Sequence, residues 1–383
     1  MSLLAFVPAC GFQSNANPGL DPDAAPVDAN APIDARPDDV DASPSTATCF
    51  GTTPRVCFES AALVPTQRLT LASDIDTAAT TACDQHNDQP AYCIVAGSAI
   101  TLPAGTTVRA FGARALVLIS TGAFELSGLL DVSSTSAAGA LHPTGPGVPN
   151  RSCNVGAFTA TVNSGGFGGS FGGKGGDGQR QDTGAADNPI AAPAVSFPVA
   201  LRAGCAGGNG STTTTGASVG QGGAGGGAVS IIASRLLLNG RINASGAAGT
   251  GGPLAKSGGG GGGSGGMIIL DTPALVTGPA FALFANGGGG GQGGAFDEGQ
   301  PKPGAGQSGT ESTAPTVAGL GGHNLETAGG AGGNGAAGAN INGVSASQEN
   351  LPGNAGGGAG GGGAGFIRAP GITTNIAPPS TNP

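Results

Sequence analysis

The chain has 383 residues, of which 78 are glycine and 28 proline, and its net charge is −9 with 14 Lys and Arg residues. This acidic balance argues against a nucleic-acid-binding protein, which needs a basic footprint, so no nucleic-acid partner is expected. Glycine and proline at this level usually indicate low complexity, but hydrophobic residues reach 38% and gather in strand-length runs. The composition therefore predicts an ordered core, with glycine-rich segments that something else must hold because ordering glycine has a large entropic cost.

The amino terminus is expected to contain an export signal. The first ten residues are largely apolar and end in Pro8-Ala9-Cys10, which resembles the end of a bacterial lipoprotein signal peptide. Residues 1–9 are then the remnant of a signal peptide, and Cys10 is the predicted lipidation site. The apolar stretch is short and has no positively charged start, which favours a signal that begins upstream of Met1. Pro8 departs from the usual residue at its place, and the alternative is an ordinary cysteine near a frayed terminus.

Residues 10–48 are predicted to form a disordered linker rich in Asp, Pro and Ala. From 16 to 48 the chain contains seven aspartates and six prolines against one basic residue, Arg36. Proline resists helix formation and like charges push a chain open, so this segment should be a solvated spacer and not a cation site. Together with Cys10 it predicts an exported protein whose partner is a membrane, reached through a lipid anchor. The expected location is the outer membrane or cell surface, or otherwise the periplasm or the extracellular space.

Six further cysteines indicate disulfides in an exported chain, because their number is even. Spacing favours pairing between neighbours, although fifteen connectivities are possible. A bridge from Cys153 to Cys205 would close the longest loop and would stabilise the fold by about 4 kcal/mol in the chain-entropy model. No two cysteines have zinc-finger spacing and the histidines are isolated, so no metal and no cofactor is predicted. The expected pairs are Cys49–Cys57, Cys83–Cys93 and Cys153–Cys205, and the histidines are His86, His142 and His323.

The body of the chain is predicted to be all-β. Strand-like apolar runs recur at 115–121, 228–234, 267–272 and 365–370, and a second apolar run and then glycine follow each of the first three. No segment shows a sustained helical period, so helix should be nearly absent. Short strands, small turns and a repeat predict a right-handed parallel β-helix-like solenoid, with a β-sandwich as the alternative.

These runs also predict the organisation along the chain. Residues 49–134 are expected to be the β-rich N-terminal part of the solenoid, 135–226 a glycine-rich insertion and 227–300 further repeats. Residues 301–383 are expected to be a glycine-rich C-terminal part with the last strand near 365–369. Alternation along the strands assigns one set of side chains to the core and another to solvent. The inward set is Leu116, Leu118, Phe124, Leu126, Leu130, Ile232, Leu236, Leu238 and Ile242, and the outward set is Glu125, Ser127, Arg235, Asn239 and Arg241.

The glycine-rich insertions have a pattern of their own. In 165–178, glycine pairs recur at nearly three-residue spacing. Three residues per turn is the geometry of the polyproline II helix, and close packing of such helices requires glycine at the contact. We therefore expect some tracts to be packed, polyglycine-II-like extended helices. A collagen triple helix is not favoured, because the period breaks and proline is not interleaved.

A glycine-rich chain matches several site motifs by chance. Ser264 lies in a nucleophile-elbow pattern, but glycine precedes it and a strand follows it, whereas the motif needs a strand before and a helix after. Lys174 ends an incomplete phosphate loop in which Gly175 stands where Ser or Thr is required. Residues 172–177 nearly fit one calcium-binding nonapeptide, a motif that needs tandem copies. We predict no catalytic, cofactor-binding or metal site from these matches.

Three groups of acidic residues are candidates for acid–base pairs: Asp74 with Asp76, Asp84 with Asp88, and Asp297 with Glu298. Polysaccharide-cleaving β-helix enzymes use clustered acids with Arg or Lys in a groove, and sugar sites usually add aromatic platforms. Neither is visible in the sequence, and the chain has no Trp. The favoured interpretation of Asp74 and Asp76 is a pair of solvent-facing strand residues.

Several features together resemble a group of glycine-rich exported lipoproteins encoded by myxobacteria and related bacteria. They are Pro8-Ala9-Cys10, the acidic linker, the segment from Cys49 to Cys57, the strand pair that starts at Leu116, and the tract 258–266 before Met267. The resemblance covers most of the chain and implies a location without implying a reaction. The leading hypothesis is a non-enzymatic envelope scaffold, structural or adhesive, whose glycine-rich loops meet envelope polysaccharide or protein partners. A polysaccharide-active β-helix lyase or hydrolase is the alternative, and ice or surface binding is a weaker third.

Overall fold

This computed structural model describes residues 47–79, 83, 91–136, 140, 143–149, 153, 156–157, 163–180, 188–213, 217–253, 256–295, 304–324, 329–347 and 355–378. The chain divides into two compact units, Met1–Ser45 and Thr46–Pro383, and every described residue belongs to the second. The predicted lipidation site Cys10 and nearly all of the predicted linker 10–48 lie outside the described residues.

Strands make up nearly all the regular structure of the described residues, and a single 3₁₀ turn, η1 (Ala61–Leu63), is the helix among them. This confirms the all-β class and the near absence of helix. The strands are β1 (Thr48–Phe50), β2 (Val56–Phe58), β3 (Arg68–Thr70), β4 (Ile75–Asp76), β5 (Tyr92–Gly97), β6 (Ala99–Leu102), β7 (Thr107–Phe111), β8 (Ala115–Leu126), β9 (Leu129–Asp131), β10 (Ala228–Leu238), β11 (Arg241–Asn243), β12 (Met267–Asp271), β13 (Leu275–Thr277), β14 (Ala282–Phe284), β15 (Phe366–Arg368) and β16 (Ile376–Ala377).

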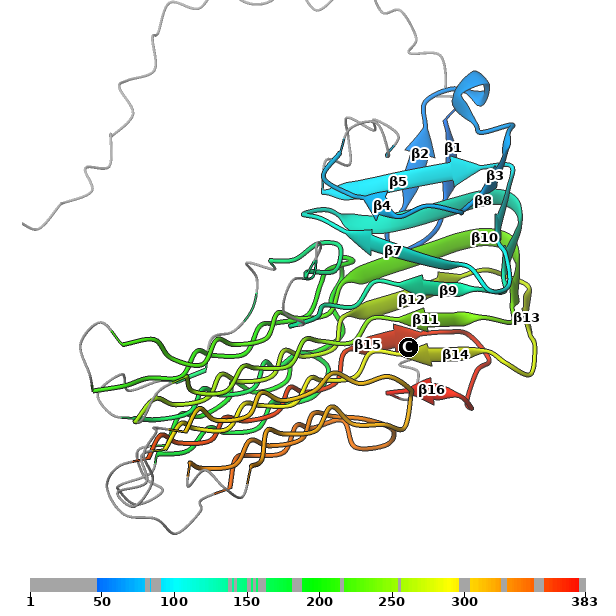
Figure 1. Ribbon diagram of the computed structural model, residues 1–383. Coiled ribbons are helices and arrows are strands. Elements are labelled where there is room, and N and C mark those ends of the chain that lie inside the picture. Colours follow the sequence, from blue (N-terminus) through cyan, green and yellow to red (C-terminus); the bar gives the residue numbers. More distant parts are fainter. Residues whose placement is uncertain are drawn as a thin grey trace, which may run out of the picture. The chain divides into compact units, whose positions relative to one another are not determined.

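Most of these strands belong to two parallel sheets (Figure 1). The first has the order β15-β12-β10-β8-β6-β3, with β13 also paired to β10 and β5 to β8. The second has the order β16-β14-β11-β9-β7-β4, and from β8 to β12 the chain alternates between the two sheets. Among the described residues, the one antiparallel pair of strands is the β1–β2 hairpin. This parallel pairing differs from that of a β-sandwich, which is built from antiparallel sheets.

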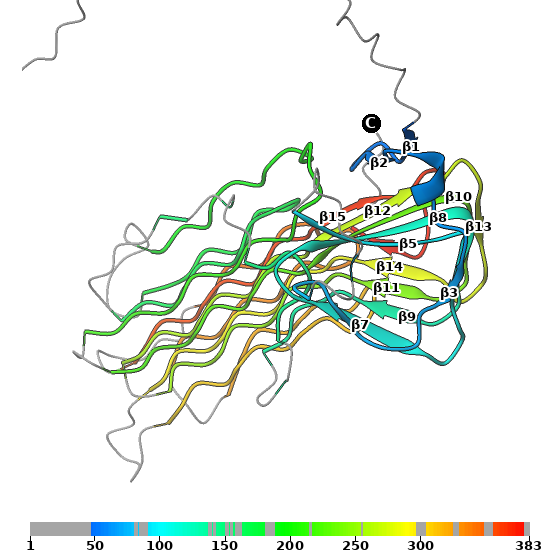
Figure 2. The same ribbon diagram turned by 90° about the horizontal axis from the view of Figure 1, so that it is seen from above.

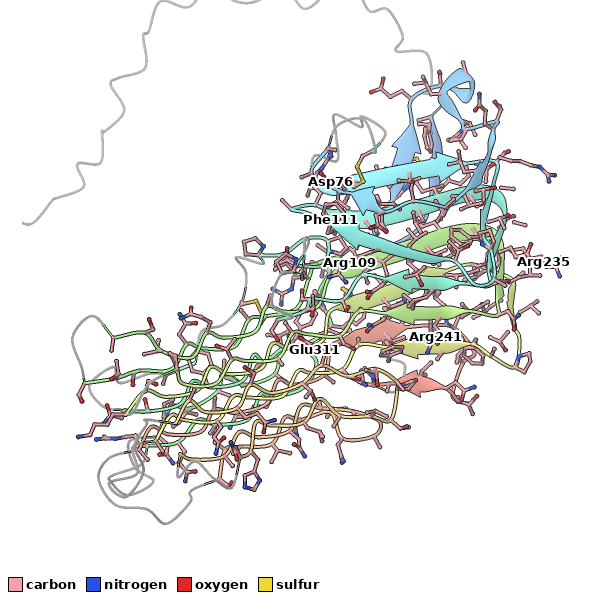
Figure 3. The ribbon with its side chains drawn as sticks, viewed as in Figure 1. Asp76, Arg109, Phe111, Arg235, Arg241 and Glu311 are labelled. Atoms are coloured by element: carbon pink, nitrogen blue, oxygen red, sulfur yellow. A yellow bond between two sulfur atoms is a disulfide. The ribbon has the colours of Figure 1, made fainter. Side chains whose placement is uncertain are left out.

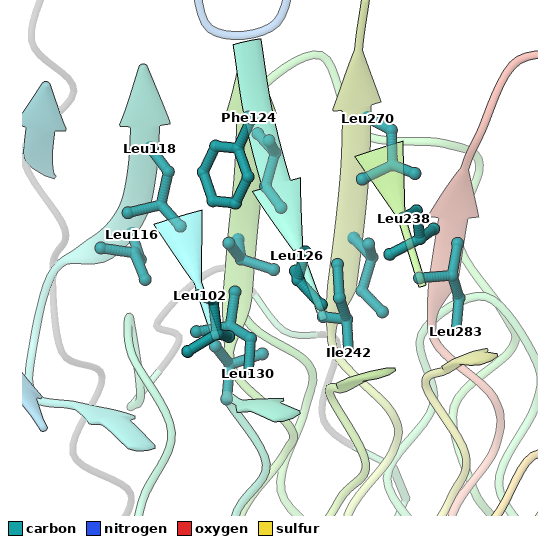
Figure 4. Packing of buried hydrophobic residues seen from close by; sticks show 14 of the residues in the cluster. Leu102, Leu116, Leu118, Phe124, Leu126, Leu130, Leu238, Ile242, Leu270 and Leu283 are labelled. Atoms are coloured by element: carbon teal, nitrogen blue, oxygen red, sulfur yellow. The ribbon is translucent and has the colours of Figure 1, made fainter. Parts of the chain in front are cut away.

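The space between the two sheets is filled by aliphatic side chains (Figure 4). All five residues predicted to point inward from β8 and β9 are fully buried in one cluster, as are Leu236, Leu238 and Ile242. The prediction was wrong for Ile232, which is buried in a second cluster on the other side of the first sheet, while Val229 and Ile231 occupy the inward positions. A register shift between Ala233 and Arg235 displaces the alternation along β10, so the period of two does not hold across it.

The first sheet is buried on its outer side as well, because part of the glycine-rich insertion and the β1–β2 hairpin cover it. Val117 and Ile119 of β8 pack there in a cluster with Phe171, Leu201 and Val56. Strands of parallel sheets that are covered on both faces carry near-continuous apolar runs, as Ala115–Ile119 does. The apolar runs in the sequence therefore reflect two buried faces.

The glycine-rich segments run side by side away from one end of the strands (Figures 1 and 2). We call these segments together the glycine bundle, and they are joined to one another by backbone hydrogen bonds. Its tracts are 163–180, 203–211, 219–227, 244–253, 257–266, 285–295, 304–312, 318–324, 329–336, 341–347 and 355–365. Each tract is thus hydrogen-bonded to other tracts and is not an independent loop.

Hydrogen bonds within the bundle repeat every three residues. In the tract 258–266 each N–H donates to a neighbouring carbonyl at 2.7–3.1 Å, and every third donor reaches the same neighbour. Gly259, Gly262 and Gly265 donate to 357–363, for example, and the other two sets donate to 205–211 and 244–250. Carbonyls of the same tract accept from three further tracts, 166–169, 220–226 and 288–294. The tract 257–266 is therefore surrounded by six others, and its polar backbone groups are satisfied without water.

Glycine is required at these contacts for steric reasons. A Cβ built on Gly261 would lie under 3.0 Å from the carbonyl of Phe167, and one on Gly262 would overlap the carbonyl of Gly288. The same overlap with backbone holds for the other glycines of this tract. The tracts approach one another at distances that only a residue without a side chain permits.

The three predicted disulfides are present: Cys49–Cys57, Cys83–Cys93 and Cys153–Cys205. The first joins the two strands of the β1–β2 hairpin. The third ties Cys153 to the bundle tract that contains Cys205 and closes a loop of 52 residues in sequence separation. The spacing argument therefore identified the connectivity correctly.

The sequence missed several short strands. β5 lies within 91–100, where Tyr92–Gly97 pairs with β8, and β13 lies between the predicted apolar run 267–272 and the one that follows it. The strand predicted near 365–369 is β15, but it is not the last, since β16 follows it and pairs with β14. A two-residue strand leaves no periodic signal in a sequence, and tertiary pairing alone defines it.

Candidate binding surface on the glycine bundle

Ser264 is a structural residue of the bundle. It is fully buried, its Oγ accepts a hydrogen bond from the Cys205 N–H at 2.8 Å, and it donates to the Gly265 carbonyl. No base is hydrogen-bonded to it within the described residues. Its hydroxyl thus satisfies a backbone donor at a place where the hexagonal packing leaves room for a small side chain.

The incomplete phosphate loop and the nonapeptide match also have a structural explanation. Lys174 Nζ lies 2.9 Å from Asp177 Oδ1, and that oxygen also accepts from the Ala191 N–H. The Asp177 carboxylate is therefore engaged by a cation and a backbone donor. Within the described residues there is no group of three or more His, Cys, Asp or Glu side chains that could hold a metal ion.

The candidate acid pairs do not form a described cleft. Asp74 is exposed and accepts from the Arg109 N–H, and Asp76 caps the Ala78 N–H at the end of β4. Asp84, Asp88, Asp297 and Glu298 lie outside the described residues, as do His86 and His142. A search of the described residues for a helix long and apolar enough to cross a membrane finds none.

The charged groups that Figure 3 labels are dispersed over the strands and the start of the bundle. Arg109 pairs with Asp131 at 2.8 Å and donates to the Ser133 carbonyl, which links β7 to the end of β9. Glu311 accepts from the Ser136 N–H at 2.7 Å and from its hydroxyl, which fastens an edge tract of the bundle to the segment after β9. Arg109 and Glu311 thus each join two segments of the chain.

Two further polar side chains tie the insertion 188–213 to the strands. Burial raises the pKa of the Tyr92 phenol above its ordinary value, and a hydrogen bond with the Leu201 backbone partly offsets this. Burial also lowers the pKa of the Arg202 guanidinium, which lies 4.8 Å from the centre of the Phe171 ring. The Phe171 ring packs in turn on Phe366 of β15. These contacts are packing interactions of the second cluster.

A shallow hollow lies on the bundle where the tract 329–336 reaches the surface. Its volume is about 550 Å³, which is within the usual size of ligand sites. Its lining consists of Asn334, Gly335 and Ala337, of Thr316 and Ala318, and of Ala339, Asn340, Ile341, Asn342 and Val344. We call the second and third of these groups its two walls. We call this hollow the edge groove.

Exposed apolar side chains flank the edge groove. Val317 and Leu320 are 47% and 57% exposed beside one wall, and Ile341 and Val344 are 41% and 53% exposed on the other. The described residues from 312 to 347 include no Asp, Glu, Lys or Arg. This surface is therefore uncharged and partly apolar, which is typical of contacts with another macromolecule.

Side-chain oxygens terminate much of the remaining edge. Asn209 Oδ1 accepts from the Gly222 N–H, Thr310 Oγ1 from the Leu320 N–H and Asn334 Oδ1 from the Gly321 N–H, each at 2.8 Å. These side-chain oxygens bond to backbone N–H groups that could otherwise pair with another chain. Proteins block the exposed edges of sheets in comparable ways. The edge of the bundle is therefore closed at these places.

Sequence reasoning did not identify the edge groove. The signal that could have found it is apolar residues three apart in glycine-rich chain, as in Val317 with Leu320 and Ile341 with Val344. Residues three apart lie on one side of a helix with three residues per turn. Comparisons with protein-family models, with curated proteins and with solved structures give no match for this chain.

Proposed function

We propose that this protein is a non-enzymatic envelope scaffold, structural or adhesive, in which the strands hold the glycine bundle as a rigid contact module. The observation that carries the proposal is the tract 257–266 with its six hydrogen-bonded neighbours. A segment whose backbone N–H and C=O groups are all hydrogen-bonded to neighbouring tracts cannot rearrange around a substrate. It can, however, support an exposed surface and keep that surface rigid.

The proposed support is a right-handed parallel β-helix. Successive strands β8, β9, β10, β11 and β12 alternate between two parallel sheets, and β8 pairs with β10 as β9 does with β11. Each passage through both sheets would be one coil, with the glycine excursions leaving at one edge of the coils. Such a stack buries a continuous core and leaves its insertions to vary.

The bundle is proposed to consist of polyglycine-II-like helices. The three-residue repeat of its hydrogen bonds and the overlap that any Cβ would cause agree with helices of three residues per turn packed side by side. An insertion of this kind would be stiff. Its surface side chains would then be presented in fixed positions, which lowers the entropic cost of binding a partner.

The proposed location is the outer membrane or cell surface, with the protein anchored through a lipid on Cys10 and with envelope polysaccharide or protein as partners. This part of the proposal depends on the sequence of residues 1–48, namely the apolar segment, Cys10 and the acidic spacer. The spacer would allow the folded unit to stand away from the membrane.

Incubation of the purified full chain with acidic and neutral glycans tests the proposal against the alternative of a polysaccharide-active enzyme. We expect no change in glycan chain length and no new reducing or unsaturated ends, since the candidate acids Asp74 and Asp76 and the carboxylate of Asp177 each accept from a backbone N–H group. Heat-unfolded protein is the control. Robust turnover of any glycan by the folded protein would overturn the scaffold proposal.

A further inference from the structure

The edge groove is an incomplete position in the packing of the bundle. The tract 329–336 is hydrogen-bonded to four neighbours, 285–295, 318–324, 341–347 and 355–365, whereas 257–266 has six. The tracts 318–324 and 341–347 form the two sides of the open part, and the edge groove lies between them. Among the described residues, two of the six positions around this tract therefore hold no neighbour, and both lie at the groove.

The backbone of 329–336 offers acceptors on this open side. In the tract 257–266, the N–H and C=O of one residue point to two adjacent neighbours. The N–H groups of Gly332 and Gly335 donate to the tract 318–324, so their carbonyls face the open position next to it. Within the described residues no donor bonds to these two carbonyls, which are three residues apart.

The tract 341–347 offers matching donors. The N–H groups of Gly343 and Val344 bond to Lys174 and Asn334, and those of Ala346 and Ser347 bond to Asp177 and Ala331. The N–H group of Ile341 has no acceptor among the described residues, and the same is true of the N–H groups of Asn342 and Ser345. They are also three residues apart, and both residues are exposed.

A flexible glycine-rich peptide is a poor occupant for this groove. Ordering its backbone would cost about 1–2 kcal/mol per residue, which exceeds the net gain of about 1 kcal/mol from each hydrogen bond. A tract that is already fixed in a folded protein avoids this cost. A charged partner would find no opposite charge on the lining, which consists of Thr, Ala, Asn, Gly, Ile and Val.

We propose that the edge groove binds the tract 341–347 of a second copy of this chain, and that the second copy's groove receives the same tract in return. Asn342 and Ser345 of each copy then donate to Gly332 and Gly335 of the other, and Ile341 and Val344 are covered. Such reciprocity is the property of a two-fold interface, in which each patch meets itself. The contact would extend the packing of the bundle from one molecule to the next.

Sedimentation equilibrium of the full chain over a range of concentrations tests this interface with two pairs of variants. Ser345→Pro removes the proposed donor and keeps a backbone compatible with a three-residue helix. Its matched control Ser345→Ala also loses the Oγ contact to the Asp177 N–H but retains the donor. Val344→Asp places a charge in the interface, and its control Val276→Asp changes a 47% exposed valine on β13.

We expect the wild-type chain to form dimers, and Ser345→Ala and Val276→Asp to dimerise equally well. Ser345→Pro should weaken dimerisation about 10- to 30-fold, because two symmetry-related hydrogen bonds are lost, and Val344→Asp should weaken it at least as much. A wild-type chain that stays monomeric at all concentrations would overturn the inference, as would equal dimerisation of all variants. Tight binding of a free glycine-rich peptide would also overturn it. Because no glycan is involved, failure here would leave the proposed function standing.

Discussion

Gly261→Ala is expected to destabilise the protein by about 3 kcal/mol. The added Cβ would overlap the carbonyl of Phe167, and the tract around Gly261 cannot move away because hydrogen bonds fix it on every side. Overpacking a dense interior usually costs 1–3 kcal/mol, and here the obstructing atoms are backbone, which yields less than a side chain. Guanidinium unfolding followed by circular dichroism measures the loss.

The matched control is Gly105→Ala, at a turn where a Cβ would meet nothing within 4 Å but φ is +74°. It should cost about 1–2 kcal/mol, the strain of a left-handed backbone alone. A Gly261→Ala variant as stable as wild type would show that the tract is loose enough to accept a side chain, which the packed bundle forbids.

Removal of the disulfide between Cys153 and Cys205 is expected to cost about 4 kcal/mol, since the loop it closes is long. The bridge also fixes the tract 203–211, in which the Cys205 carbonyl accepts from the Ser264 N–H and the Cys205 N–H donates to the Ser264 hydroxyl. The Cys153→Ala, Cys205→Ala double variant, unfolded in parallel with the wild type, gives this value directly.

The double variant Cys49→Ala, Cys57→Ala serves as the comparison, because that bridge spans a sequence separation of 8. Its loss should cost about 2.5 kcal/mol in the same chain-entropy account. A smaller loss for the long loop than for the short one would contradict the account, and would mean that the insertion stays ordered in the unfolded chain or was never held by the bridge.

The fold was predictable where apolar side chains recur. Leu116, Leu118 and Phe124 are separated by even numbers of residues along β8, and burial of such residues dominates the free energy of folding. The prediction failed at Ile232 because the pairing of β10 with β8 shifts register between Ala233 and Arg235, which a strict period of two along the strand does not anticipate. The disulfides were predictable because each bridge joins two cysteines that follow one another along the chain.

The candidate surface was not predictable in the same way. Ile341 and Val344 resemble ordinary loop residues until it is known which tracts are adjacent, and adjacency in the bundle links residues such as Gly262 and Gly360 that are far apart in sequence. The tracts consist largely of glycine and therefore differ little from one another in their side chains. The sequence thus carries almost no information on which tracts pair. The three-residue period led to the prediction of extended helices with three residues per turn, but it carries no information on which tracts are neighbours.

Amide hydrogen exchange tests most directly the claim that the glycine tracts form a packed, hydrogen-bonded bundle. Amides across 258–266 should exchange slowly, at least about a thousandfold below the unfolded-chain rate and comparably to those of β10, since each donates to a buried carbonyl. Uniform fast exchange through 165–178 and 258–266, with β10 protected, would contradict the claim, because the strands would then be folded and the glycine tracts would be loops.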